Sequence, residues 1–161
     1  FLLVFNLLSI PLYIALYTNF SFEPLKQINA EIVSATLRLF GFVSHSEDSI
    51  VDIATNNGTQ KIEISWDSTG WKSMYAVAAL ILATPAVNIS KKLKAALVSV
   101  GIIFAVNFLR ITTTILISAT FGFKLFDIVH TVLWREGLIL AVIAVWVAWM
   151  RMEKYKIWKI K

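Results

Sequence analysis

The chain has 161 residues, of which 58% are apolar and 16% are charged, and its formal net charge is +5. This composition is typical of an integral membrane protein, so nucleic-acid binding is a poor explanation of the positive charge. The sequence has no cysteine, which excludes disulfides and cysteine-based metal sites, and its two histidines, His45 and His130, are too few to form a metal site unaided. We therefore expect no cofactor and no nucleic-acid partner.

The first segments in chain order are an apolar run and an amphipathic stretch. Residues 1–18 are nearly uncharged and about long enough for a helix that crosses a hydrocarbon core of roughly 30 Å. The sequence starts inside this run without an initiator Met, so we expect further helices before Phe1. Residues 24–42 have apolar side chains at mostly helical spacing, which favours an interfacial helix over a span because three charged residues interrupt them: Lys26, Glu31 and Arg38.

Residues 50–65 predict a β-hairpin. Two short β-prone runs, residues 50–53 and 61–64, flank a polar segment that contains Asn57-Gly58. Asn-Gly between such runs is a strong signal for a tight turn between antiparallel strands.

Three further apolar segments predict transmembrane helices over residues 69–88, 94–122 and 128–150, followed by a basic tail over residues 151–161. Together with residues 1–18 they give at least four spans. The sequence therefore predicts a single membrane domain, an all-α integral membrane protein. Its fold would be a polytopic helical bundle with an interfacial amphipathic helix and a small external β-hairpin.

The basic residues predict the orientation of these spans. Eight of the fifteen lysines and arginines lie in the loop over residues 91–94 or in the tail, whereas nine of the ten acidic residues lie elsewhere. Basic residues concentrate on the cytoplasmic side of membrane proteins. The loop and the tail would then be cytoplasmic, and the hairpin would lie outside a multi-pass protein of the plasma membrane.

Three polar residues from three segments come to the same outer layer. Ser68 precedes a predicted helix and can cap it, near unpaired backbone amides at the positive end of the helix dipole. Counting about 1.5 Å per residue, Arg110 lies roughly 24 Å from the cytoplasmic edge and His130 roughly 31 Å from it. An arginine inside a span is costly unless it faces a cavity or a partner, so Arg110 is a candidate for a functional site.

Each of these residues also has a structural explanation. Ser68 can be only a helix cap, since serine is among the commonest caps. Arg110 can form an ion pair with Glu136, with Asn107 one turn away. His130 can be an interfacial residue that makes hydrogen bonds.

The order of the motifs resembles that of the exosortase and archaeosortase family of membrane transpeptidases. Residues 66–73 read Trp-Asp-Ser-Thr-Gly-Trp-Lys-Ser, and Asn107-Phe108-Leu109-Arg110 and then His130 follow them. The family has a Cys-Thr-Gly or Cys-Ser-Gly motif, then Asn-x-x-Arg, then a helix-initiating His. The resemblance covers roughly residues 35–137, and the motifs are short individually but share one order and one side of the membrane.

The resemblance implies cleavage of a C-terminal sorting signal on an exported protein and acyl transfer to an acceptor, for which a lipid is one candidate. It assigns catalytic roles to Ser68, Arg110 and His130. The physical chemistry suits these roles, because a helix start favours an anionic nucleophile, an arginine stabilises an oxyanion and a histidine transfers protons. The supporting residues are Asp67, Gly70, Lys72, Asn107 and Glu136.

Ser68 departs from the family pattern, which has a cysteine at this position. A serine hydroxyl needs a well-placed general base to become nucleophilic, whereas a cysteine thiol does not. Three explanations of Ser68 remain open. It can be an engineered change that inactivates the protein, or the chain can be a natural relative with lost or altered catalysis. The third is a serine enzyme that uses Lys72, one helical turn away. The alternative function is that of a catalytically silent structural subunit in a larger complex with other membrane subunits. A transporter ranks third, because no inverted repeat is visible in the sequence.

The two basic clusters generate a topology prediction. A single cysteine placed at Asn57 should react with an impermeant thiol reagent in sealed cells, whereas one placed at Lys92 should react only after the cells are opened, because lysine-rich loops stay cytoplasmic. Labelling at 92 but not at 57 in sealed cells would refute an external site.

Overall fold

The computed structural model describes the backbone of residues 1–55, 58–85, 87–121 and 134–158. Side chains are described for residues 1–55, 58–85, 87–120 and 137–153. The chain forms two compact units, and α4 (Ile89–Phe121) contributes to both. Unit 1 comprises residues 1–20, 72–104 and 137–161, and unit 2 comprises residues 21–71 and 105–136.

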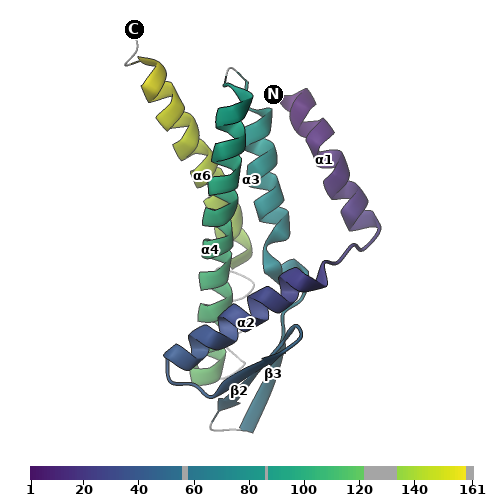
Figure 1. The fold of residues 1–161 in the computed structure, drawn as a ribbon, viewed down its shortest axis with the longest axis vertical. Coiled ribbons are helices and arrows are strands. Elements are labelled where there is room, and N and C mark those ends of the chain that lie inside the picture. The colour runs from purple at the N-terminus through teal and green to yellow at the C-terminus, as the bar shows by residue number, and fades with distance from the viewer. Residues whose placement is uncertain (56–57, 86, 122–133, 159–161) are drawn as a thin grey trace. The chain divides into compact units, whose positions relative to one another are not determined.

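Unit 1 is helical, and it contains the first half of α4 (Figure 1). Its other helices are α1 (Leu2–Tyr17), most of α3 (Trp71–Ala83) and most of α6 (Trp134–Trp158). Polar side chains tie these helices together, because the Tyr75 hydroxyl donates to the Leu8 carbonyl and the Trp146 indole donates to Thr84 Oγ1 at 3.0 Å. Such bonds satisfy polar groups that water does not reach within a helical bundle.

One helix of the described residues, Ile89–Thr120, is long and apolar enough to cross a membrane. The helices α1, with 16 residues, and α3, with 13, are apolar but shorter. The predicted count of at least four spans therefore stays a prediction. The helix α4 begins at Ile89 rather than at residue 94, because Asn88 Oδ1 accepts the Ser90 amide at 2.9 Å and caps the first turn.

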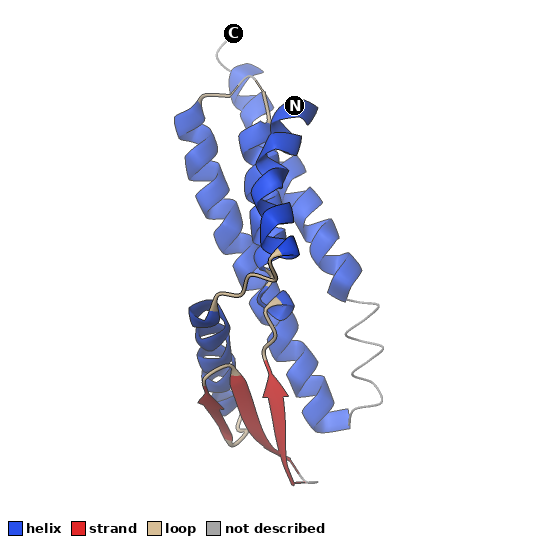
Figure 2. Cartoon of the chain, turned by 90° about the vertical axis from the view of Figure 1, so that its right-hand side faces the viewer, coloured by secondary structure: helices blue, strands red, loops and turns tan. Residues whose placement is uncertain are grey.

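Unit 2 contains the predicted hairpin as β2 (Ile50–Thr55) and β3 (Gly58–Glu63), which pair antiparallel with Thr55 opposite Gly58 (Figure 2). A third strand, β1 (Ser44–Glu47), pairs antiparallel with β2, so the sheet order is β1-β2-β3. The sequence does not predict β1, because Ser-His-Ser-Glu contains none of the residues that favour strands, namely Val, Ile, Thr, Phe, Tyr and Trp. The predicted two-stranded hairpin is thus part of a three-stranded sheet in a mostly helical protein.

The helix α2 (Glu23–Leu39) packs against β1 and β2. Ala30, Val33 and Leu37 follow helical spacing, are fully buried, and form a core with residues of the sheet and of the second half of α4. The remaining members of that core are Val51, Ile53, Ile64, Ile111 and Ile115. The predicted interfacial helix therefore places one face on the sheet, and its location at a membrane interface stays a prediction.

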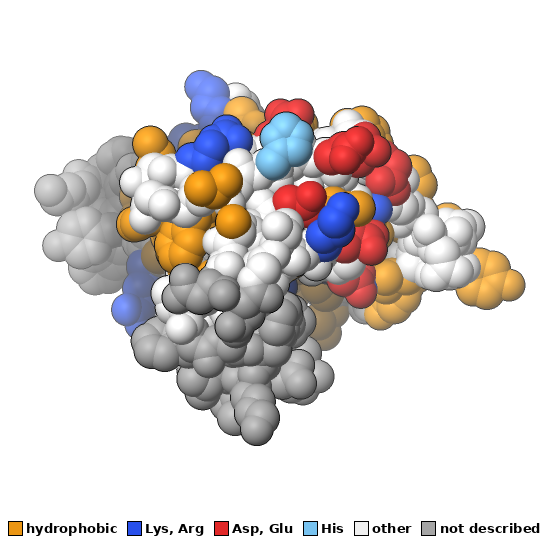
Figure 3. Space-filling view, turned by 90° about the horizontal axis from the view of Figure 1, so that it is seen from below, with side chains coloured by type: hydrophobic (Ala, Val, Ile, Leu, Met, Phe, Trp, Pro, Cys, Tyr) orange, Lys and Arg blue, Asp and Glu red, His pale blue; other side chains and the backbone are white. Residues whose placement is uncertain are grey.

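The surface around the sheet carries charged side chains of both signs (Figure 3). Lys61 and Asp52 face each other across β2 and β3, with Nζ and Oδ2 3.7 Å apart. Exposed acidic residues include Glu47, Asp48 and Glu63. These charges are consistent with a segment that meets water beside an otherwise apolar protein.

Candidate functional site

Ser68 lies in a single turn of 3-10 helix, η1 (Asp67–Thr69), which follows β3. The Ser68 amide donates to the Ser65 carbonyl at 3.0 Å and to Ser65 Oγ at 3.2 Å. The hydroxyl oxygens of Ser65 and Ser68 are 2.8 Å apart. Thr69 is fully buried, and its hydroxyl donates to the Trp66 carbonyl at 2.7 Å. The turn that presents Ser68 is thus fixed by its own side chains.

Gly70 separates this turn from the next helix. Its φ of 76° lies in the left-handed region, and α3 begins only at Trp71. The helix predicted over residues 69–88 therefore begins later than expected, and Ser68 does not cap it, because the left-handed Gly70 lies between η1 and α3. Ser68 and Lys72 consequently do not lie on one continuous helix, and a Ser-Lys dyad stays a prediction.

Asn107 of α4 holds the turn from the other side. Its side chain is fully buried, and Nδ2 donates to the Ser68 carbonyl at 2.9 Å. A Cβ added to Gly70 would lie 2.7 Å from Asn107 Cγ, so only glycine allows this close approach. The Asn-x-x-Arg motif therefore contacts the Ser-Thr-Gly motif directly.

Ser68 and Arg110 line one cavity of about 60 Å³ in unit 2. Arg110 lies three residues after Asn107 on α4, and residues at this spacing lie on the same side of a helix. The other lining residues come from β3, the segment after it and the next turn of α4: Ile62, Glu63, Ile64, Ile111, Thr114 and Ile115. The cavity thus combines a hydroxyl, a guanidinium and largely apolar walls.

The guanidinium of Arg110 retains capacity to bind an anion. Its Nε is buried and has no hydrogen-bond partner among the described residues. A buried donor without a partner costs free energy, so an oxygen ligand that accepts from it would be bound favourably. The alternative partner, Glu136, lies in the first turn of α6, and its side chain lies outside the described residues.

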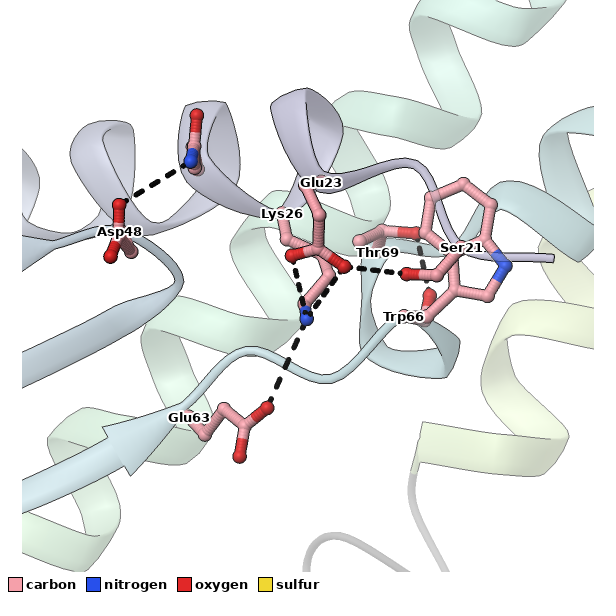
Figure 4. Close-up of polar contacts among 8 residues, drawn as sticks. Ser21, Glu23, Lys26, Asp48, Glu63, Trp66 and Thr69 are labelled. Atoms are coloured by element: carbon pink, nitrogen blue, oxygen red, sulfur yellow. Dashed lines mark hydrogen bonds and ion pairs between the residues drawn. The ribbon is translucent and has the colours of Figure 1, made fainter. Parts of the chain in front are cut away.

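An ion-pair cluster joins the start of α2 to the cavity (Figure 4). Lys26 Nζ is 3.0 Å from Glu23 Oε2 and 3.9 Å from Glu63 Oε1, and Ser21 Oγ donates to Glu23 Oε1 at 2.9 Å. The hydrogen bonds from Lys26 and Ser21 lower the pKa of the exposed Glu23 carboxyl. Lys26 thereby places a positive charge beside Glu63, a residue that lines the cavity.

The structure describes only part of the predicted catalytic set. Ser68 and Arg110 are brought together, and Asn107 and Gly70 support them. Asp67 is exposed in η1. His130 lies outside the described residues, and so does the side chain of Glu136.

No group of three His, Asp or Glu side chains in the part of the chain that the structure describes lies close enough to hold a metal ion. The expectation of a site without cofactor stays a prediction.

Sequence reasoning missed Ser65 and Glu63. Ser65 lies three residues before Ser68, the spacing at which a serine side chain bonds a backbone amide at the start of a turn, so that signal was present. Glu63 gave no comparable signal, because a charged residue near the end of a hairpin is usually just solvated.

The model of the transmembrane exosortase family (Exosortase_EpsH) matches residues 1–150, a range that includes Ser68, Arg110 and His130. No curated protein and no solved structure matches the chain.

The contact between Gly70 and Asn107 generates a prediction. Gly70→Ala should lower the free energy of unfolding by about 1–3 kcal/mol, because Cβ meets Asn107 Cγ and alanine is strained at positive φ. Thermal unfolding of the purified protein in detergent measures this effect. The control is Gly101→Ala in α4, where an added Cβ meets nothing within 4 Å and alanine favours the helix. Equal midpoints for the two variants would contradict the prediction.

Proposed function

Because the chain belongs to the transmembrane exosortase family, we propose that it is a membrane transpeptidase that processes the C-terminal sorting signal of exported proteins. The nucleophile would be the side chain at position 68. The observation that supports this role most directly is that Ser68 and Arg110, from motifs 42 positions apart in the sequence, line one cavity. His130 completes the proposed set by resemblance to the family.

The proposed reaction has two stages. The nucleophile at position 68 gives its proton to His130 and attacks the carbonyl carbon of the scissile peptide bond, and the carbonyl oxygen takes the negative charge. The C–N bond then breaks, the amine of the released tail takes a proton from His130, and the remainder of the substrate stays bound as an acyl-enzyme. A nucleophilic group of the acceptor, which we propose to be a lipid, then gives its proton to His130 and attacks the acyl carbon. The bond between the acyl carbon and the side chain at position 68 breaks, and His130 returns the proton to that side chain.

Arg110 would stabilise the oxyanion of each tetrahedral intermediate. Its guanidinium offers several N–H donors in a fixed plane, and one of them, Nε, is buried without a partner among the described residues. Donors that are already oriented need no rearrangement when charge develops, which is why such groups make large contributions to catalysis. The apolar walls of the cavity strengthen this effect, because they lower the local dielectric.

A hydroxyl at position 68 would react more slowly in this site than a thiol. A cysteine thiol has a pKa near 8.5 and is converted to thiolate by modest electrostatic help, whereas a serine hydroxyl needs a strong general base. We therefore propose that the chain with Ser68 is inactive or altered in activity. The site would face outward from a multi-pass protein of the plasma membrane, where exported substrates arrive.

Ser68→Cys tests this proposal. The serine form should not process an exported protein that bears a C-terminal sorting signal, and the cysteine form should release its tail, because the scaffold stabilises a thiolate far better than it activates a hydroxyl. Coexpression followed by mass measurement of the substrate reports the outcome. The introduced thiol should also be alkylated, and it is the only thiol in that variant, since the chain has no cysteine of its own.

Ser90→Cys is the matched control for Ser68→Cys, because its exposed thiol lies in unit 1 at the start of α4 and should give no processing. Absence of processing by Ser68→Cys, with an unreactive thiol, would favour a structural subunit.

Arg110→Lys tests the oxyanion role. In the Ser68→Cys background it should reduce processing by about a hundredfold, because lysine keeps the charge but loses the planar set of donors. The readout is the initial rate of tail release. Arg151→Lys at an exposed position of α6 is the control and should keep the full rate. Full activity of Arg110→Lys would indicate that Arg110 only neutralises Glu136.

A further inference from the structure

Ser65 lies close to Ser68 and belongs to neither of the two motifs that form the site. Its backbone follows Ile64, which is 2% exposed and whose amide donates to the Ser49 carbonyl at 2.7 Å, so the segment is anchored. The Ser65 side chain itself is exposed. Its Oγ lies 2.8 Å from Ser68 Oγ, which is the distance of a good O–H···O hydrogen bond.

We propose that Ser65 is a positioning residue whose hydroxyl holds the nucleophilic atom at position 68 and donates a hydrogen bond to it when that atom becomes an anion. This inference rests on the proposed function, in which the side chain at position 68 is the nucleophile.

The direction of the hydrogen bond follows from the atoms that surround it. In the neutral pair either hydroxyl can donate to the other. The Ser68 amide already donates to Ser65 Oγ at 3.2 Å, so Ser65 Oγ is used as an acceptor and its hydrogen is available to donate. An anion at position 68 has no hydrogen left to give, so in that state Ser65 must be the donor.

A donor that acts on the charged form shifts the equilibrium toward that form. A hydrogen bond to an anion is roughly twice as strong as one between neutral groups, so Ser65 stabilises the anion more than the neutral side chain. The consequence is a more nucleophilic side chain at position 68 near neutral pH. The effect is largest for a thiol, because the pKa of a thiol lies close to neutral pH.

Other charges near position 68 act on the same equilibrium. Arg110 on α4 favours the anion, whereas Glu63 on β3 and the neighbouring Asp67 on η1 oppose it. The side chains of His130 and Glu136 lie outside the described residues. All of these groups are the same in a series that changes Ser65 alone, so differences within the series report on Ser65.

The experiment uses the full chain with Ser68→Cys and compares Ser65, Ser65→Ala and Ser65→Thr. The rate of alkylation by iodoacetamide is measured against pH in detergent, and its midpoint gives the pKa of the thiol introduced at position 68. Ser65→Ala should raise the midpoint by about 0.5–1 pH unit and slow alkylation at pH 7 about three- to tenfold, because the anion loses one donor. Ser65→Thr keeps the hydroxyl and should restore the original midpoint.

Ser90→Ala, which removes an exposed hydroxyl at the start of α4, is the matched control and should leave the midpoint unchanged. If Ser65 only caps the turn, Ser65→Ala will lower the unfolding temperature and leave the midpoint where it was, which would overturn the proposal. Failure of Ser65→Thr to restore a shifted midpoint would overturn it as well. The measurement needs no substrate, so absence of processing by Ser68→Cys would count against the sorting reaction without changing this result.

Discussion

The hydrogen bond from Asn107 Nδ2 to the Ser68 carbonyl is the constraint on which the candidate site depends. It joins the turn that presents position 68 to the long apolar helix that carries Arg110. The bond needs the left-handed Gly70, because any Cβ there would occupy the space of the Asn107 side chain. Two short motifs that are far apart in the sequence thus contact each other, and each helps to position the other.

The walls of the cavity belong to the same hydrophobic core that stabilises unit 2. Ile64, Ile111 and Ile115 line the cavity and are also members of the core formed by α2, the sheet and α4. Protein cores are close-packed and transmit small displacements, so the positions of Ser68 and Arg110 depend on the packing below them. The sheet also contributes to the cavity directly, because β3 supplies Ile62 and Glu63 to the lining.

The sequence predicted the parts of this arrangement that depend on local chemistry. The Asn-Gly turn identified the hairpin, and distance counting along apolar helices suggested that Ser68 and Arg110 lie in one layer. It could not predict β1, because these polar residues form a strand only where the edge of β2 is available for pairing. It also could not predict the end of η1 at Gly70, because that position depends on the tertiary contact with Asn107. Ser65 was missed because its importance depends on a single side-chain distance.

The groups around position 68 can stabilise an anion, so the ionisation of the side chain at this position depends on whether its terminal atom is oxygen or sulfur. The guanidinium of Arg110 and the hydroxyl of Ser65 both stabilise an anion more than a neutral group. A thiol at this position can lose its proton near neutral pH and gain from both, whereas a hydroxyl stays protonated and gains only an ordinary hydrogen bond. Under the proposed function, a serine at this position therefore leaves Arg110 and Ser65 without the anion that they would stabilise.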